Sequence, residues 1–200
     1  NAFDPGEMHS YISMFRKTTD QLINLTGMLR RIGRIQRNEE KFSPGPLDLR
    51  EISGYLLDQH SLSAAQKRIT IRNQIPSGTI VWADPSYVHD VLSELLGNSV
   101  KFTRADGHGL IEIRVRPDPA GVPELCVSDN GVGIEKGVRG KLFHLDGEFL
   151  SLGTEDERGS GMGLIVCKML ADANGSDIYF EDNPSGGTTF ALRIPAAKSE

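Results

Sequence analysis

The stretch Asp129-Asn130-Gly131-Val132-Gly133-Ile134 decides how the rest of this sequence is interpreted. It follows directly on a predicted strand at residues 124–128, whose centre Leu125-Cys126-Val127 is apolar, so the aspartate and the glycines stand at a strand end. Glycines let the backbone approach a flat ligand closely, and the aspartate can accept a hydrogen bond from an exocyclic amine. Taken alone, the same residues could also form an ordinary Asp-Asn-Gly turn. The neighbouring segments therefore decide between the two interpretations.

A helix is predicted before this stretch, from a cap at Asp84 with a following proline to about residue 102. Glu94 and Asn98 lie one turn apart on it, and Lys101 follows on nearly the same face. Such a row suits a bound Mg-triphosphate. The amide oxygen would coordinate Mg²⁺, the ammonium would offset phosphate charge, and the carboxylate would order a water or another nucleophile. The alternative is a solvated helix face.

A second glycine-rich stretch, Gly159-Ser160-Gly161-Met162-Gly163, opens a predicted helix over residues 161–173. Free N–H groups at a helix N-terminus, together with the helix dipole, favour an anion. The polar, unpatterned residues 152–158 before it are typical of a mobile lid. The sequence contains neither a P-loop nor a strand followed directly by Gly-x-Gly-x-x-Gly.

The other patterns alternate between short strands and helices. Asp48 can cap a helix that runs to about residue 65. Pro76-Ser77-Gly78 is the expected turn between two strand-like runs at 68–75 and 79–83. Further strands are predicted at residues 110–116, 124–128, 178–181 and 188–194. Because adjacent strand pairs stand at both ends and helices lie between them, the sequence predicts a two-layer α/β sandwich with a mixed sheet.

A long helix is predicted ahead of this domain, over residues 8–37. Its apolar residues recur at three- and four-residue steps and form a narrow stripe. They are Ile12, Phe15, Leu22, Leu25, Leu29, Ile32 and Ile35. Such a stripe indicates a helical hairpin or a dimer seam. Ser43-Pro44-Gly45-Pro46 cannot continue the helix, so we expect one domain over residues 1–45 and another over 46–200.

Composition excludes several classes of protein. Hydrophobic content of 38% and charged content of 24% are those of an ordinary globular chain. The net charge of −5 argues against a nucleic-acid partner. The two cysteines lie in apolar runs, which favours buried thiols over a disulfide or zinc site. No apolar run is long enough to cross a bilayer, so we expect a cytoplasmic chain without membrane contact, or the cytoplasmic part of a larger sensor.

Five segments, taken in order, resemble the sequence boxes of sensor histidine kinases, which belong to the gyrase, Hsp90, histidine kinase and MutL ATPase superfamily. The segments are Glu94 to Thr103, Asp129 to Gly133, Leu142-Phe143, Gly159 to Leu164, and Gly187 to Phe190. The phrase from Leu152 to Leu164 closely resembles a common kinase lid. The long helix with Ile32-Gly33-Arg34-Ile35 is similar to the second helix of the kinase dimerisation hairpin. The resemblance covers about residues 46 to 195.

The resemblance implies a Bergerat-type ATP-binding fold and a role for each matching residue. Asn98 would bind Mg²⁺, Asp129 would read the adenine amine, and Gly131 and Gly133 would line the base pocket. Gly159, Gly161 and Gly163 would form the lid hinge and phosphate cradle, and Thr188 would support adenine through water. Lys101 and Glu94 are the candidate catalytic residues. Glu94 stands where kinases often have asparagine and where gyrase-like ATPases have a water-activating glutamate.

The implied reaction passes the γ-phosphoryl group of ATP to a histidine. His9 is followed by Ser10-Tyr11-Ile12, which does not match the acceptor motif, so the acceptor is expected outside this chain. The implied partners are ATP or ADP, a second copy through the helical hairpin, and a response regulator or receiver domain. Two alternatives remain open. One is a nucleotide-binding or partner-sequestering module without kinase activity, and the other is a superfamily ATPase or protein-serine kinase.

Overall fold

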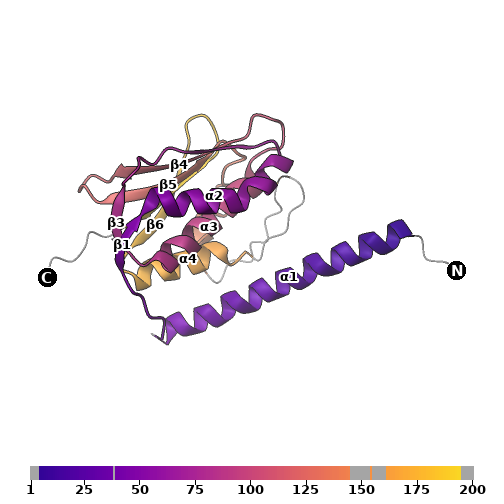
Figure 1. Cartoon of the computed structure of the whole chain (residues 1–200), viewed down its shortest axis with the longest axis horizontal. Coiled ribbons are helices and arrows are strands. Elements are labelled where there is room, and N and C mark those ends of the chain that lie inside the picture. Colours follow the sequence, from indigo (N-terminus) through magenta and orange to yellow (C-terminus); the bar gives the residue numbers. More distant parts are fainter. Residues whose placement is uncertain (1–4, 38, 145–153, 155–160, 195–200) are drawn as a thin grey trace. The chain divides into compact units, whose positions relative to one another are not determined.

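Helix α1, Pro5–Gln36, makes up most of the first of two units into which the chain divides, Asn1–Glu40 and Lys41–Glu200 (Figure 1). The computed structural model describes residues 5–37, 39–144, 154 and 161–194. Large apolar side chains on α1 are exposed, among them Ile12, Phe15, Leu22 and Leu29. No helix in these ranges is both long and apolar enough to cross a membrane.

The second unit contains the remaining helices and all strands that the structure describes. In chain order they are β1 (Gly45–Asp48), α2 (Leu49–Gln66), β2 (Thr70–Asn73), β3 (Ile80–Ala83), α3 (Pro85–Phe102), β4 (Leu110–Pro117), β5 (Pro123–Asp129), the short 3-10 helix η1 (Arg139–Lys141), α4 (Gly163–Ala173), β6 (Asp177–Asp182) and β7 (Thr188–Arg193).

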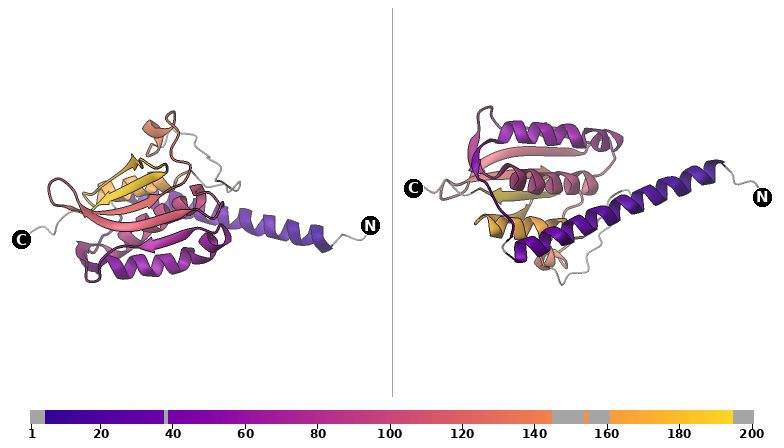
Figure 2. Two further views of the ribbon diagram at one scale, coloured as in Figure 1. Left: turned by 90° about the horizontal axis from the view of Figure 1, so that it is seen from above. Right: turned by 60° about the horizontal axis from the view of Figure 1, so that its bottom comes forward.

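Five of the strands form one mixed sheet in the order β2-β4-β5-β7-β6. The β2–β4 pair is parallel, and the pairs β4–β5, β5–β7 and β6–β7 are antiparallel. Helices α2, α3 and α4 lie side by side on one face of this sheet (Figures 1 and 2). The expected two-layer α/β sandwich with a mixed sheet is therefore confirmed.

The core forms around α3, the middle helix of the layer. Val88, Leu92 and Leu96 recur at four-residue steps and are fully buried. Asp84 caps the helix as expected, with its Oδ1 accepting from the Tyr87 N–H at 2.9 Å. Its Oδ2 accepts a second bond, of 2.7 Å, from the N–H of Ser43. These two contacts fix the N-terminal end of α3, the helix that carries Glu94, Asn98 and Lys101.

Two strands differ from the sequence-based prediction. The residues 76–78 do not join a hairpin, because β2 pairs with β4 whereas β3 pairs with β1 in a separate two-stranded sheet. Strand β1 was not predicted, because Gly45 and Pro46 are typical of a break rather than a strand. Proline is tolerated there because the two-stranded sheet has only edge strands.

Candidate nucleotide-binding site

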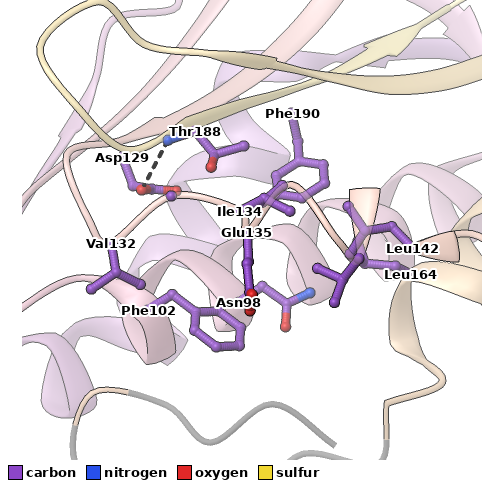
Figure 3. Close-up of a pocket in the computed structure, with 12 residues that line it drawn as sticks. Asn98, Phe102, Asp129, Val132, Ile134, Glu135, Leu142, Leu164, Thr188 and Phe190 are labelled. Atoms are coloured by element: carbon purple, nitrogen blue, oxygen red, sulfur yellow. Dashed lines mark hydrogen bonds between the residues drawn. The ribbon is translucent and has the colours of Figure 1, made fainter. Parts of the chain in front are cut away.

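A cavity of about 230 Å³ lies between α3, the end of β5, the segment that follows it, α4 and β7 (Figure 3). Its apolar wall consists of Phe102, Val132, Ile134, Val138, Leu142, Leu164 and Phe190. Its other lining residues are Asn98, Asp129, Gly133, Glu135 and Thr188. Pockets that enclose a whole drug-sized ligand measure about 300–1,000 Å³. This cavity is smaller than that, so it would enclose part of a nucleotide rather than the whole molecule.

Asp129 is held in the cavity by several hydrogen bonds. One carboxylate oxygen accepts from the N–H of Gly131 at 2.9 Å and from the N–H of Thr188 at 3.2 Å. The other accepts from the Ser99 hydroxyl at 3.4 Å. The backbone carbonyl of Asp129 accepts from the Asn183 amide at 2.6 Å, which ties the β6–β7 turn to the end of β5. The side chain is thus oriented by three hydrogen bonds, and a fourth holds its backbone.

Burial raises the pKa of Asp129 above the usual carboxyl range, because little solvent reaches the charged form. The three hydrogen bonds to the carboxylate oppose this shift and favour the ionised state. An ionised carboxylate can only accept hydrogen bonds. It therefore suits a ligand that presents an amine, such as the exocyclic amine of adenine.

Two glycines let the backbone close around Asp129. A side chain at Gly131 would collide with the carbonyl of Phe102, and one at Gly187 would collide with the backbone of Asp129 and Asn130. Gly187 also has a φ of 88°, which L side chains rarely adopt. These positions accept no larger residue without displacing the aspartate.

The three candidate residues on α3 lie in different surroundings. Asn98 lines the cavity. The Glu94 carboxylate lies against Gly163 at the start of α4, and burial raises its pKa. The Lys101 ammonium lies 4.6 Å from the centre of the Phe102 ring, and that ring lines the cavity. Of the three residues in the predicted row, Asn98 borders the cavity, whereas Glu94 and Lys101 are not among its lining residues.

The second glycine-rich stretch ends beside the same cavity. Gly163 is the first residue of α4, and its neighbour Leu164 lines the cavity. Met162 stands at the N-cap of this helix, and its side chain makes no capping hydrogen bond. Gly161 has a φ of 72° and admits only a residue that tolerates the left-handed region. Gly159 and the lid phrase, apart from Thr154 and the residues from Gly161 on, lie outside the described residues.

Comparison with known proteins explains this arrangement. Residues 83–198, more than half of the chain, match the family model described as histidine kinase-, DNA gyrase B-, and HSP90-like ATPase. The chain belongs to this ATPase family. The pocket of Asp129, Thr188 and Asn98 lies within the matched range, and membership implies that the domain binds ATP.

The similar proteins are sensor kinases. The chain is 28% identical to the sensor protein EvgS of Escherichia coli, over 94% of this chain and 16% of EvgS. It is 31% identical to the adaptive-response sensory kinase SasA of Prochlorococcus marinus, over 78% of this chain and 42% of SasA. A solved structure, the histidine kinase AdeS of Acinetobacter baumannii, aligns with a TM-score of 0.75 at 18% identity, over 99% of this chain and 88% of that one. The resemblance to histidine kinases is thus confirmed, although the chain spans less than half the length of either sequence relative.

Several residues that build the site received no role from the sequence. Ser99 and Phe190 stand inside two of the boxes but were assigned no role there. Asn183, Ile134 and Val138 lie outside the boxes. Ile134 is held by Arg139, which donates two bonds to its carbonyl and pairs with Asp182 at 2.6 Å. A single arginine in an irregular segment gives no sequence signal for such a role.

Proposed function

We propose that this chain is the ATP-binding catalytic domain of a sensor histidine kinase, which passes the γ-phosphoryl group of ATP to a histidine outside this chain. The observation that carries the proposal is the buried carboxylate of Asp129, which accepts three hydrogen bonds at the edge of a largely apolar cavity. The match to the ATPase family and the sensor-kinase relatives support it.

The base would enter the cavity with its exocyclic amine towards Asp129. Gly131 and Gly133 would let the backbone approach the ring, and Thr188 would support it from β7. The phosphates would then extend from the cavity towards the N-terminus of α4, where Gly161 and Gly163 would form the cradle together with Gly159. The free N–H groups of a helix start favour this placement of negative charge.

Magnesium would be held by the Asn98 amide oxygen and by phosphate oxygens of the nucleotide. This donor set fits Mg²⁺, which prefers oxygen ligands and commonly shares its coordination between few protein groups and a substrate phosphate. Within the ranges that the structure describes, no three His, Cys, Asp or Glu side chains gather as a metal site. A bound Mg²⁺ neutralises phosphate charge during phosphoryl transfer. Lys101 would assist from the next turn of α3.

Residues 1–45 would act as the second helix of a dimerisation hairpin in this proposal. The exposed apolar side chains of α1 would pack against helices of the same kind in a homodimer, and a response regulator or receiver domain would dock there. We place the protein in the cytoplasm and assign no nucleic-acid partner to it, in line with its net charge of −5.

Incubation with γ-labelled ATP tests the transfer step. The chain should bind Mg-ATP and remain unlabelled, because no histidine in it stands in an acceptor motif. Supplying a sensor-kinase helical hairpin with an acceptor histidine should yield acid-labile label on that hairpin. Label on His9 would contradict the absence of an acceptor, and tight binding without any transfer would favour a nucleotide-binding or sequestering module.

One residue favours a second candidate, a hydrolysing ATPase or protein-serine kinase. Glu94 carries a carboxylate with a raised pKa next to the proposed phosphate cradle, which is where a base for water would be placed. Release of free phosphate that disappears in Glu94→Gln, with nucleotide affinity unchanged, would support the ATPase. Acid-stable label on serine would support the protein-serine kinase.

A further inference from the structure

The segment 130–142, which the structure describes throughout, forms one wall of the cavity. Apart from the three residues of η1, it belongs to no helix or strand. The backbone bonds that Val138 and Lys141 donate reach only three residues back, so they close turns and do not fix the wall relative to the sheet. The position of this wall therefore depends on contacts with other elements. Its apolar lining residues are Val132, Ile134, Val138 and Leu142.

Arg139 ties this wall to the sheet. Its Nε and Nη2 donate to the carbonyl of Ile134 at 3.0 and 2.9 Å. Its Nη1 and Nη2 donate to the carboxylate of Asp182, the last residue of β6, at 2.6 and 2.9 Å. A planar guanidinium that faces both oxygens of a carboxylate forms a pair of defined geometry. The side chains of Arg139 and Asp182 are 32% and 53% exposed, so the pair contributes little to global stability and matters chiefly for position.

Asp182 stands beside the residues that support Asp129. It pairs in register with Thr188, whose N–H donates to the Asp129 carboxylate at 3.2 Å. The next residue in the chain, Asn183, donates to the Asp129 carbonyl at 2.6 Å. The connection between β6 and β7 therefore holds Asp129 directly and holds the wall of the cavity through Arg139.

We infer that Arg139 and Asp182 form a clamp that fixes the wall at Ile134 relative to Asp129, so that affinity for the purine base depends on this ion pair. Neither Arg139 nor Asp182 lines the cavity, so both are positioning residues. The inference rests on the proposed function, since it takes this cavity as the adenine site. It adds a determinant of base affinity that lies outside the glycine-rich stretches.

Variants at position 182 test the clamp. Asp182→Asn removes the charge and one acceptor at nearly constant shape, whereas Asp182→Glu keeps both carboxylate oxygens. Glu181→Gln is the matched control, because this neighbouring carboxylate pairs with Arg116 instead. Affinities for adenosine and for Mg-ADP are measured by calorimetry, and stability is measured by urea unfolding without ligand.

We expect Asp182→Asn to weaken binding of adenosine and of Mg-ADP by the same factor, about fivefold, because the clamp acts on the base that both ligands share. Asp182→Glu should restore most of the affinity, and Glu181→Gln should bind as the original protein does. A purely structural pair would lower the free energy of unfolding and leave both affinities unchanged. That result, or an equal loss of affinity in Glu181→Gln, would overturn the inference.

Arg139→Gln and its combination with Asp182→Asn test whether the two residues act as one unit. Arg139→Gln should lose at least as much affinity as Asp182→Asn, because it also gives up the bonds to the Ile134 carbonyl. The double variant should bind as Arg139→Gln alone does, since Asp182 acts through Arg139. Losses that multiply would overturn the inference.

Failure of the clamp and failure of the proposed function are distinguishable. If the original protein binds neither adenosine nor Mg-ADP, the proposed function fails and the clamp is overturned with it. If it binds both and Asp182→Asn binds them equally well, the clamp alone is refuted. If Arg139→Gln does not fold, the variants at position 182 decide.

Discussion

At the scale of single residues, the proposed role of Asp129 in ligand recognition comes at a cost to the folded state. Asp129 is 6% exposed, and burial raises its pKa because the charged form is poorly solvated there. The hydrogen bonds from Gly131, Thr188 and Ser99 recover part of that cost. A neutral amide of the same shape would avoid the cost and could still accept the two backbone bonds.

Asp129→Asn should therefore raise the stability of the empty protein while it weakens nucleotide binding. The amide presents a donor where the exocyclic amine needs an acceptor, which costs roughly 1–3 kcal/mol of binding free energy. Calorimetry with ADP measures the loss, and urea unfolding without nucleotide measures the gain. Unchanged ADP affinity would refute the assignment of Asp129 to adenine.

The stability gain of Asp129→Asn should depend on pH. A carboxyl with a raised pKa in the folded state contributes most stability when protonated in both states, below the unfolded value of about 3.9. That contribution is lost as pH rises through the raised folded pKa. The difference in unfolding free energy between variant and original should therefore grow from pH 4 towards neutral pH. A constant difference across that range would mean that Asp129 is not the group responsible.

At the scale of secondary-structure elements, α2 ends in a Schellman motif at an unfavourable residue. The N–H of Ile69 bonds to the carbonyl of Ala64 at 2.8 Å, and the N–H of Arg68 bonds to that of Ala65 at 3.0 Å. Arg68 occupies the position that glycine usually takes and has a φ of 56°. This turn places Lys67 at the helix end, where its ammonium donates to the carbonyls of Val100 and Lys101 at the end of α3.

Arg68→Gly should stabilise the protein by about 1 kcal/mol, because glycine adopts the left-handed region without steric cost. Thermal and urea unfolding measure the change. Arg68→Ala, which keeps the strained φ and removes the exposed side chain, is the control and should stay close to the original. An equal gain in both variants would show that the side chain, not the backbone, is responsible.

Helices and caps were predictable from the sequence because their signals are local. The cap at Asp84 and the spacing of Val88, Leu92 and Leu96 define α3 within a few residues. Strand partners are not local. The residues of β3 are strand-like in either arrangement, and only the fold as a whole pairs Val81 with Leu47 rather than with β2.

The same distinction applies to the candidate site. Asn98, Asp129 and Gly133 stand in short motifs, and the structure brings them to one cavity. The apolar wall was not predictable, because Phe102 and Phe190 come from elements whose proximity depends on the order of the sheet. The pair of Arg139 and Asp182 was also missed, since the two residues stand in segments far apart in the chain.

At the scale of the whole molecule, every residue that lines the cavity belongs to the unit Lys41–Glu200. Leu29 lies in the other unit, is 53% exposed, and belongs to the apolar stripe of α1. Burial of such a stripe against a partner helix is favoured by about 25 cal/mol for each Å². Association and nucleotide binding should therefore respond to different substitutions.

Leu29→Asp should shift the species seen in sedimentation towards the monomer and leave ADP affinity unchanged. A charge in the stripe opposes helix association, whereas the cavity lies in the other unit. Arg30→Asp, on the neighbouring exposed residue outside the stripe, is a control for the added charge. Unchanged sedimentation with lost ADP affinity would show that α1 is needed by the nucleotide-binding unit.

The double use of Asp84 has a mechanical consequence. Its carboxylate caps α3 and also holds the N–H of Ser43, while Gly45 pairs with Ala83 in the adjoining strands. A pull on the chain at Lys41 is therefore transmitted within two residues to the first turn of α3. Because a helix is stiff along its axis, such a displacement would shift α3 as a whole, Asn98 at the cavity included. The start of this unit is therefore mechanically coupled to the cavity through the two hydrogen bonds of one carboxylate.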